Sequence, residues 1–356
     1  MMLHNVGDDA GTGNFAGAAQ DTGVTLSEIR RIGVLTSGGD APGMNAAVRA
    51  VTRSAAVRGI EVVGIRKGYN GLIEDDMVPL SSENVSGILH TGGTMLQTAR
   101  SEEFRTVAGR VRAADTIRRQ MLDAVIVIGG DGSFTGATVL SQEHDVACIG
   151  IPATIDNDIF GTDYTIGYET ALNTVIEAVD KIRDTAVSHG RIFFVEVMGH
   201  EAGMLALSSG VACGAEVILI PESREQHEEL RKFVTCGYRQ KHTSGIVIVA
   251  EGDEPGGAMK IAEEVRKEHP QLEVRVSILG HIQRGGSPVA RDRINATRLG
   301  VGAVEALLAG KRNVMIGLQN DVLVPVPFAM AVKEFQGLDR ELLRVHGQLT
   351  GLGECD

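Results

Sequence analysis

Short apolar runs that end in glycine or polar clusters recur along this chain, and they constrain its fold more than any other feature. Between them lie segments of helix-compatible composition, such as residues 168–185 and 255–268. Continuous apolar strands that alternate with helices favour parallel sheets covered by helices on both faces. The sequence therefore predicts an α/β protein. The apolar runs span residues 32–36, 61–65, 122–128, 146–151, 191–197, 215–220, 245–250, 273–279 and 313–317.

Length and charge narrow the class of protein further. A chain of 356 residues exceeds a typical single core, and its 43% hydrophobic content is enough for two lobes. The 45 glycines sit mostly at strand ends, which indicates close backbone turns. A net charge of −12 argues against nucleic-acid binding, so an anionic substrate must meet a local basic cluster.

The cysteines and the N-terminal residues indicate the cellular compartment in which we expect the protein. Cys148, Cys213, Cys236 and Cys355 have no close paired spacing, so neither a zinc site nor a disulfide framework is supported, and we expect a reducing cytoplasm. No apolar run approaches the roughly 20 residues that span a bilayer, and no signal peptide is evident, so we expect no membrane association. Residues 1–29 lack periodicity and are predicted to be a mobile extension.

The run Gly129-Gly130-Asp131-Gly132-Ser133 follows one of the apolar strands and precedes a predicted helix near Phe134. Glycines at a strand end let backbone N–H groups approach a phosphate, and the following helix start favours an anion. Asp131 adds one carboxylate, which suits Mg²⁺ held beside substrate phosphates. A plain strand-to-helix turn with a polar cap is the alternative.

A similar strand–loop–helix unit lies earlier in the chain. Residues 32–35 form its predicted strand, and its helix is predicted to begin at Met44. The glycine-rich loop between them is Thr36-Ser37-Gly38-Gly39-Asp40-Ala41-Pro42-Gly43. Pro42 suits a helix entrance because its φ angle is fixed and it lacks an N–H group. Neither loop matches the common nucleoside-triphosphate loop or the dinucleotide fingerprint, so the sequence disfavours both of those binding motifs.

A third cluster, Pro152-Ala153-Thr154-Ile155-Asp156-Asn157-Asp158, follows the strand that ends at Ile151. In phosphoryl transfer a carboxylate accepts the proton of the attacking hydroxyl. We take Asp156 as the better base candidate and Asp158 as a residue that tunes or orients it. A hydrogen-bonded turn without catalytic function is the alternative.

A fourth cluster, residues 281–288, begins with His281-Ile282-Gln283-Arg284 and suits a second phosphate. Arg275 and Arg191 are further candidates, because arginine offers a fixed fork of donors to phosphate oxygens. Each arginine could instead be an ordinary surface residue, and His281 could hydrogen-bond only within its own loop.

Taken together, these motifs resemble the phosphofructokinase family from Arg30 to about Asn320. The resemblance rests on five ordered stretches: residues 33–45, residues 129–133, residues 152–158 with 161–167, residues 195–199, and residues 280–288.

The resemblance implies phosphoryl transfer from ATP to the 1-hydroxyl of fructose 6-phosphate in glycolysis, with Mg²⁺ as cofactor bound by Asp131. It makes Asp156 the general base, with Thr154 beside the transferred group. Together with Asp158, which we take to tune or orient Asp156, these are the predicted catalytic residues. The positions that it assigns to ATP are Gly39, Arg100, Ser101, Gly130, Asp131, Gly132 and Ser133. The positions that it assigns to the sugar phosphate are Thr154, Ile155, Asp156, Arg191, Met198, Gly199, His200, Glu251, Arg275, His281, Ile282, Gln283 and Arg284.

The resemblance also implies an active site in the cleft between two lobes of mostly parallel sheet flanked by helices. We expect residues 30–166 and about 283–333 in an ATP-binding lobe, and residues 167–282 and about 334–356 in a fructose 6-phosphate-binding lobe. In bacterial relatives Arg191 and Arg275 reach a neighbouring subunit's site. We therefore expect a homo-oligomer, with a tetramer favoured over a dimer.

Four positions depart from or discriminate within the family pattern. Pyrophosphate-using relatives commonly carry Asp and Lys where this chain has Gly132 and Ala153, and the small neutral pair favours ATP. Ser101 replaces an aromatic found in some bacterial relatives. His200 stands where the family has arginine, so it could serve a phosphate weakly, in a pH-dependent way, or be only a helix-entrance residue.

Three rival functions remain open at this point. A pyrophosphate-dependent enzyme would act on the same acceptor. A lipid or NAD kinase shares a Gly-Gly-Asp-Gly loop, but the cluster at residues 281–288 disfavours it. A non-catalytic regulatory subunit would bind the sugar phosphate without turnover, and the retention of Asp131 and Asp156 disfavours that reading.

Overall fold

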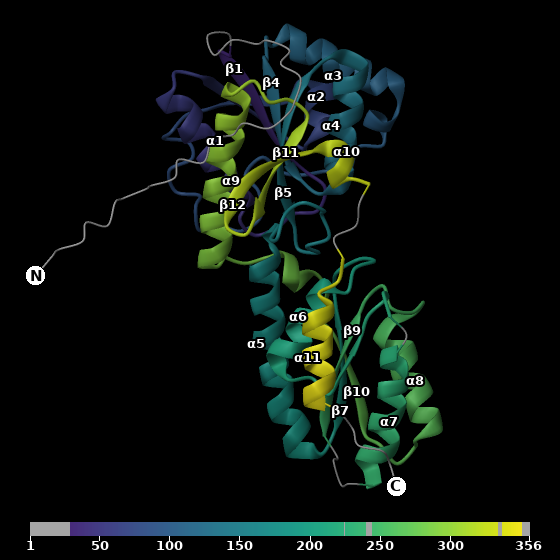
Figure 1. The fold of residues 1–356 in the computed structure, drawn as a ribbon. Helices are drawn as coiled ribbons and strands as arrows, with labels where there is room; N and C mark the ends of the chain where they lie inside the picture. Colours follow the sequence, from purple (N-terminus) through teal and green to yellow (C-terminus); the bar gives the residue numbers. More distant parts are fainter. Residues whose placement is uncertain (1–28, 224, 240–243, 334–336, 351–356) are drawn as a thin grey trace, which may run out of the picture.

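The computed structural model describes residues 29–223, 225–239, 244–333 and 337–350, and these form two lobes, each built on its own sheet (Figure 1). The predicted N-terminal extension lies outside the described residues, apart from residue 29. Among the described helices, none is both long and apolar enough to cross a membrane.

The first lobe contains an eight-stranded sheet with the order β12-β11-β5-β4-β1-β2-β3, and β6 pairs with β5. All neighbours in it are parallel except β2–β3 and β11–β12, which are antiparallel pairs at the two edges. The strands are β1 (Arg31–Ser37), β2 (Glu61–Ile65), β3 (Met77–Leu80), β4 (Ala124–Gly129), β5 (Ala147–Thr154), β6 (Ile166–Gly167), β11 (Val314–Gln319) and β12 (Val322–Pro327).

Helices cover both faces of this sheet because side chains alternate along each buried strand. In β4, Ile126 belongs to the core beneath α1 and α9, whereas Val127 belongs to the core on the opposite face. The helices are α1 (Met44–Val57) and α9 (Ala290–Leu308) on one face, and α2 (Tyr69–Glu74), α3 (Val107–Arg119), α4 (Asp131–His144) and α10 (Phe328–Ala331) on the other.

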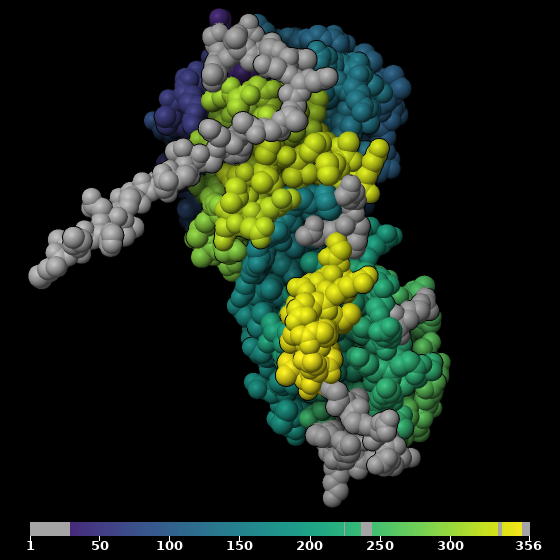
Figure 2. Space-filling view, in the orientation of Figure 1, coloured from purple at the N-terminus to yellow at the C-terminus, as the bar shows by residue number. Residues whose placement is uncertain are grey.

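The second lobe contains a four-stranded, wholly parallel sheet with the order β10-β7-β9-β8. The strands are β7 (Ile192–Val197), β8 (Val217–Leu219), β9 (Gly245–Ala250) and β10 (Val274–Ile278). One face is covered by α5 (Tyr168–His189), α6 (Met204–Cys213) and α11 (Arg340–Thr350), and the other by α7 (Glu225–Arg239) and α8 (Gly257–Glu268). Helix α11, coloured yellow, lies on the surface of this lobe although it follows the last strands of the first (Figure 2).

The chain passes between the lobes at two segments that matter for the site. It enters the second lobe along α5, which begins between the lobes and runs down the second (Figure 1). It returns through the short 3₁₀ helix η2 (Gly280–Arg284) into α9. The catalytic candidates at the end of β5 and just after it precede the first segment, and His281 and Arg284 lie in the second.

The predicted α/β class with mostly parallel sheets is confirmed. Each of the nine predicted strands is present, with ends that shift by a few residues, but β3, β6 and β12 were not predicted. All strands of the first sheet lie within residues 31–167 and 314–327, and those of the second lie within residues 192–278. The lobe boundaries drawn from the sequence stay a prediction.

Candidate active site

The first glycine loop (residues 36–43) and the second glycine loop (residues 129–133) lie side by side because β1 pairs with β4, with Ser37 opposite Gly129. A Cβ atom at Gly129 would lie 2.5 Å from the Ser37 backbone oxygen and from Ser133 Oγ, so only glycine allows this approach. Helix α4 begins at Asp131, and no side chain caps its first N–H groups. Uncapped N–H groups and the helix dipole make this helix start suitable for a phosphate.

The segment that carries Arg100 and Ser101 is held against the first glycine loop. Thr36 Oγ1 donates to the Gln97 backbone oxygen at 2.8 Å, and Thr98 Oγ1 donates to the Gly38 backbone oxygen at 2.7 Å. These bonds bring Arg100 and Ser101, which follow directly in the chain, to the mouth of the loop.

The carboxylates after β5 lie beside the second glycine loop, because β5 pairs with β4 and places Pro152 opposite Gly129. Thr154 Oγ1 donates to Asp156 Oδ2 at 3.1 Å and accepts from the Asp156 backbone N–H at 3.2 Å. Asp156 Oδ1 is buried and has no hydrogen-bond partner among the described residues. One carboxylate oxygen is thus fixed by Thr154 while the other is left to accept a proton.

Burial shifts the acidity of both carboxylates. Loss of hydration raises the pKa of Asp156, although Arg284 and the Thr154 hydroxyl oppose the shift. Loss of hydration and the neighbouring Asp156 charge raise the pKa of Asp158 to about 6. A carboxylate whose pKa is raised toward neutrality is a better proton acceptor, so both shifts suit general-base chemistry.

Asn157 holds these two carboxylates in place. Its Oδ1 accepts from the Thr165 backbone N–H at 2.7 Å, and its Nδ2 donates to the Asp163 backbone oxygen at 3.1 Å. Thr165 Oγ1 in turn donates to the Thr154 backbone oxygen at 2.7 Å. Asn157 has a φ of 53°, in the left-handed region that asparagine tolerates better than most residues.

The second lobe and the returning segment supply the opposite wall. His200 follows β7, and its backbone N–H donates to Glu251 Oε1 at 2.9 Å. Gln283 is buried, accepts from the Met198 backbone N–H at 3.2 Å and so fixes η2 against the end of β7. Arg284 Nη1 donates to the Asp40 backbone oxygen at 3.3 Å. Arg284 therefore reaches from η2 to the first glycine loop.

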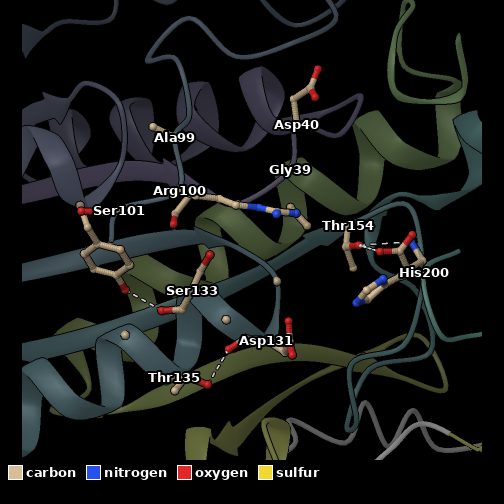
Figure 3. Close-up of a pocket in the computed structure, with 18 of the residues that line it drawn as sticks. Gly39, Asp40, Ala99, Arg100, Ser101, Asp131, Ser133, Thr135, Thr154 and His200 are labelled. Carbon is tan, nitrogen blue, oxygen red and sulfur yellow. Dashed lines mark hydrogen bonds between the residues drawn. The ribbon is translucent and has the colours of Figure 1, made fainter. Parts of the chain in front are cut away.

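These parts enclose one cavity of about 1060 Å³ (Figure 3). In the close-up, Ser101 and Ser133 lie toward one end, and Thr154 and His200 toward the other. Most of the site residues predicted from the sequence line the cavity, and these are Gly39, Arg100, Ser101, Gly130, Asp131, Gly132, Ser133, Thr154, Asp156, Met198, His200, Glu251, His281 and Arg284.

The remaining predicted residues do not line the cavity, and they fall into two groups. The first lies close to it in sequence and consists of Ile155, Asp158, Gly199, Ile282 and Gln283. The second is Arg191 and Arg275, which lie at the amino ends of β7 and β10, whereas the cavity lies beyond the carboxyl ends. Both arginines contact Glu273, at 2.9 Å and 3.3 Å. This chain alone therefore does not bring them to the cavity.

Several cavity residues were missed by the sequence reasoning. Tyr69 and Phe104 stack with ring centroids 4.0 Å apart, so aromatic side chains do line the end near Ser101. Arg110 is buried, pairs with Glu143, and donates to the backbone oxygens of residues 104 and 105. None of these residues belongs to a glycine or acidic motif. An aromatic three residues after Ser101 was the only local signal.

The carboxylates of the cavity decide which metal ion it suits. No cluster of three or more His, Cys, Asp or Glu residues able to hold a metal occurs in the part of the chain that the structure describes. Asp131, exposed at the start of α4 and lining the cavity, offers one hard-oxygen donor beside the phosphate-binding loop. Mg²⁺ usually takes one or two protein carboxylates and completes its shell with water and substrate phosphates, so this arrangement fits Mg²⁺ that arrives with a phosphate substrate.

Comparison with known proteins gave consistent results. A sequence model described as phosphofructokinase matches residues 31–307. The ATP-dependent 6-phosphofructokinase 2 of Bacteroides thetaiotaomicron is 54% identical over 325 residues, 91% of this chain and 100% of that protein. The ATP-dependent 6-phosphofructokinase 1 of Thermus thermophilus is 51% identical over 317 residues, 89% of this chain and 98% of that protein.

Solved structures with the same architecture include a phosphofructokinase from Saccharomyces cerevisiae, with a TM-score of 0.80 and 37% identity over 91% of this chain and 47% of that chain. A pyrophosphate-dependent phosphofructokinase from Nitrosospira multiformis has a TM-score of 0.79, covers 91% of both chains and is 21% identical. The second likeness concerns the fold alone.

Proposed function

The chain belongs to the phosphofructokinase family, and from that premise we propose that it transfers a phosphoryl group from MgATP to the 1-hydroxyl of D-fructose 6-phosphate. The products are ADP and fructose 1,6-bisphosphate. The observation that carries the proposal is the single cavity in which the Thr154–Asp156 pair faces the glycine loops from one side and the His281–Arg284 segment from the other.

Asp156 acts as the general base in this reaction. Its Oδ1 accepts the proton of the sugar's 1-hydroxyl as that oxygen attacks the terminal phosphorus of ATP. Thr154 donates to the other oxygen of the carboxylate at 3.1 Å, which leaves Oδ1 without a hydrogen-bond partner among the described residues. Asp158 is half-buried beside Asp156, and loss of hydration together with the Asp156 charge raises its own pKa to about 6.

The nucleotide occupies the end of the cavity formed by the two glycine loops. Uncapped N–H groups at the start of α4, with Ser133, bind the phosphates, and Gly39, Arg100 and Ser101 lie across from them. Asp131 would hold Mg²⁺, which offsets phosphate charge when it is bound. Tyr69 and Phe104 form the apolar wall next to Ser101 and provide the surface against which a base packs.

The sugar phosphate occupies the end formed by the second lobe. His281 and Arg284 offer donors to its phosphate, and Glu251 and the backbone around Met198 offer partners to its hydroxyl groups. His200 lies between these groups, with its backbone fixed by Glu251 at 2.9 Å. A local basic cluster is needed here because the whole chain carries a net charge of −12.

We assign Arg191 and Arg275 to the site of a neighbouring subunit, which makes the enzyme a homo-oligomer, with a tetramer favoured. The support is their position at the end of the second lobe away from this chain's own cavity. Mixing two inactive variants, Asp156→Asn and Arg275→Ala, tests the assignment after dissociation and reassociation. Recovered activity supports a shared site, whereas an inactive mixture that has reassembled contradicts it.

ATP is the proposed donor rather than pyrophosphate. Gly132 and Ala153 both line the cavity, and a Cβ atom at Gly132 would meet no protein atom within 4 Å. That space suits a nucleotide's inner phosphate, which a pyrophosphate donor lacks. We place the enzyme in the cytoplasm, because Cys148 and Cys213 are free thiols.

The direct test supplies purified protein with Mg²⁺, fructose 6-phosphate and either ATP or pyrophosphate, and measures fructose 1,6-bisphosphate. Turnover with ATP is the expected result. Turnover mainly with pyrophosphate would overturn the donor assignment, and binding of fructose 6-phosphate without turnover would favour a regulatory subunit.

A further inference from the structure

Asp292 is a carboxylate with no exposed surface that the proposed mechanism does not use. It lies in the first turn of α9, yet its hydrogen bonds go to another helix. Oδ1 accepts from the Gly167 backbone N–H at 2.9 Å, and Oδ2 accepts from the Thr170 backbone N–H at 2.8 Å and from Thr170 Oγ1 at 2.5 Å. Asp292 therefore caps the start of α5 from more than 120 residues away.

Helix α5 has no cap of its own. Its N-cap residue is Gly167, which has no side chain to accept from the first N–H groups. The Asp292 carboxylate takes that place and also meets the positive end of the α5 dipole. Thr170 completes the connection, because its Oγ1 accepts from the Val289 backbone N–H at 3.0 Å.

These bonds join two of the segments by which the chain passes between the lobes. Gly167 belongs to β6 and lies opposite Thr154 in the pairing with β5, so one side of the connection reaches the Thr154–Asp156 pair. Val289 and Asp292 directly follow the segment that carries His281 and Arg284, so the other side reaches the sugar-phosphate wall. Gly43, before α1, packs on the same point: a Cβ atom there would lie 3.6 Å from Asp292 Cβ.

Joining two helices through a buried carboxylate costs free energy, because the charged group loses its hydration. Burial raises the pKa of Asp292 to about 6 in spite of three hydrogen bonds to it. Replacing such a group with apolar residues is often neutral or stabilising. We therefore look for its role in the orientation of the two helices and not in the stability of the fold. Two carboxylate oxygens at fixed angles can orient two helix starts relative to each other, which an apolar contact cannot do.

We propose that Asp292 is a positioning residue that clamps α5 to α9 and thereby sets the spacing between the Thr154–Asp156 pair and the His281–Arg284 segment. The inference rests on the proposed function, because it takes these two groups to bind opposite ends of one sugar phosphate. ATP contacts come from the first lobe alone, so the clamp governs fructose 6-phosphate and not the nucleotide.

The test compares three variants by steady-state kinetics. Asp292→Asn keeps the size of the side chain but turns an N–H group toward the Thr170 donors, and we expect KM for fructose 6-phosphate to rise about 10-fold, as for a lost charged hydrogen bond. KM for ATP should change less than about 2-fold. Thr170→Val removes one donor and should give a smaller rise in the same constant. The matched control is Thr52→Val, a buried threonine that bonds only within α1, to the Val48 backbone oxygen at 2.8 Å.

Equal effects of Asp292→Asn on both substrates, or a lower kcat with an unchanged KM for fructose 6-phosphate, would overturn the clamp. If Asp292→Asn does not fold, Thr170→Val carries the same comparison against Thr52→Val. In the double variant the effects should combine to less than their product, because both changes remove one shared interaction.

Hydrogen exchange separates failure of the clamp from failure of the proposed function, because it requires no turnover. In Asp292→Asn or Thr170→Val, exchange should accelerate both at the start of α5 and in residues 280–289, but not in Thr52→Val. Faster exchange confined to α5 would refute the clamp even if the enzyme is active. Faster exchange in both segments of a protein that makes no fructose 1,6-bisphosphate would refute only the proposed function.

Discussion

Gly132→Asp introduces a carboxylate where the structure has room for one. Gly132 is the second residue of α4, it is exposed to the cavity, and a Cβ atom there meets no protein atom within 4 Å. Acidic residues are also favourable in the first turn of a helix. The substitution should therefore leave the fold and its stability unchanged and act only on what enters the cavity.

The size of the effect follows from charge repulsion between the new carboxylate and the inner phosphate of ATP. At a separation of about 5 Å and an effective dielectric constant of about 20, two unit charges repel by ~3 kcal/mol. A cost of ~3 kcal/mol lowers kcat/KM on the order of 100-fold. Pyrophosphate has no inner phosphate at this position, so its use should be affected far less.

The assay measures kcat/KM for ATP at saturating fructose 6-phosphate, beside the thermal stability of each variant. Gly132→Asn is the matched control, because it has the same shape as Gly132→Asp but no charge, and we expect it to lose less than about 10-fold. Equal losses in both variants would show that bulk, and not charge, is responsible. A loss of less than about 3-fold in Gly132→Asp would refute the placement of the nucleotide over Gly132.

Further outcomes follow from other parts of the structure. Asp156→Asn should lower kcat by about 100-fold or more while fructose 6-phosphate still binds, as measured by calorimetry, because only the proton acceptor is lost. The acid limb of kcat/KM should lie at higher pH than an ordinary aspartate would give, since the pKa of Asp156 is raised and the base must be deprotonated; a limb at the ordinary position would contradict this. Gly39→Ala would place a Cβ atom 2.5 Å from Arg284 Nη1 and should raise KM for fructose 6-phosphate without lowering the melting temperature. The folded protein holds the Asp292 proton more tightly than the unfolded chain does, so the free energy of unfolding linked to this group is greatest at low pH and falls as pH rises through about 6. In Asp292→Asn, the free energy of unfolding measured with urea should no longer show this fall between pH 4 and 7.

The edge strands are a part of the fold that the sequence did not predict. The central strands are long apolar runs, and burial on both faces makes that pattern unmistakable. Strands β3 and β12 contain Pro79, Pro325 and Pro327 and were not predicted, because proline usually argues against a strand. Each lies at an edge of the sheet in an antiparallel pair, where a missing N–H group is tolerated.

The candidate site divides in the same way. By itself the sequence determined the α/β class, the glycine loops and the polar groups at strand ends, because parallel strands bring their carboxyl ends to one edge and local pattern marks each end. Only the tertiary structure brought Tyr69 and Phe104 to the wall of the cavity and turned Asp292 from a residue of its own helix into the cap of another. Such contacts join segments far apart in the chain, and their energy depends on distances and burial that no local pattern records.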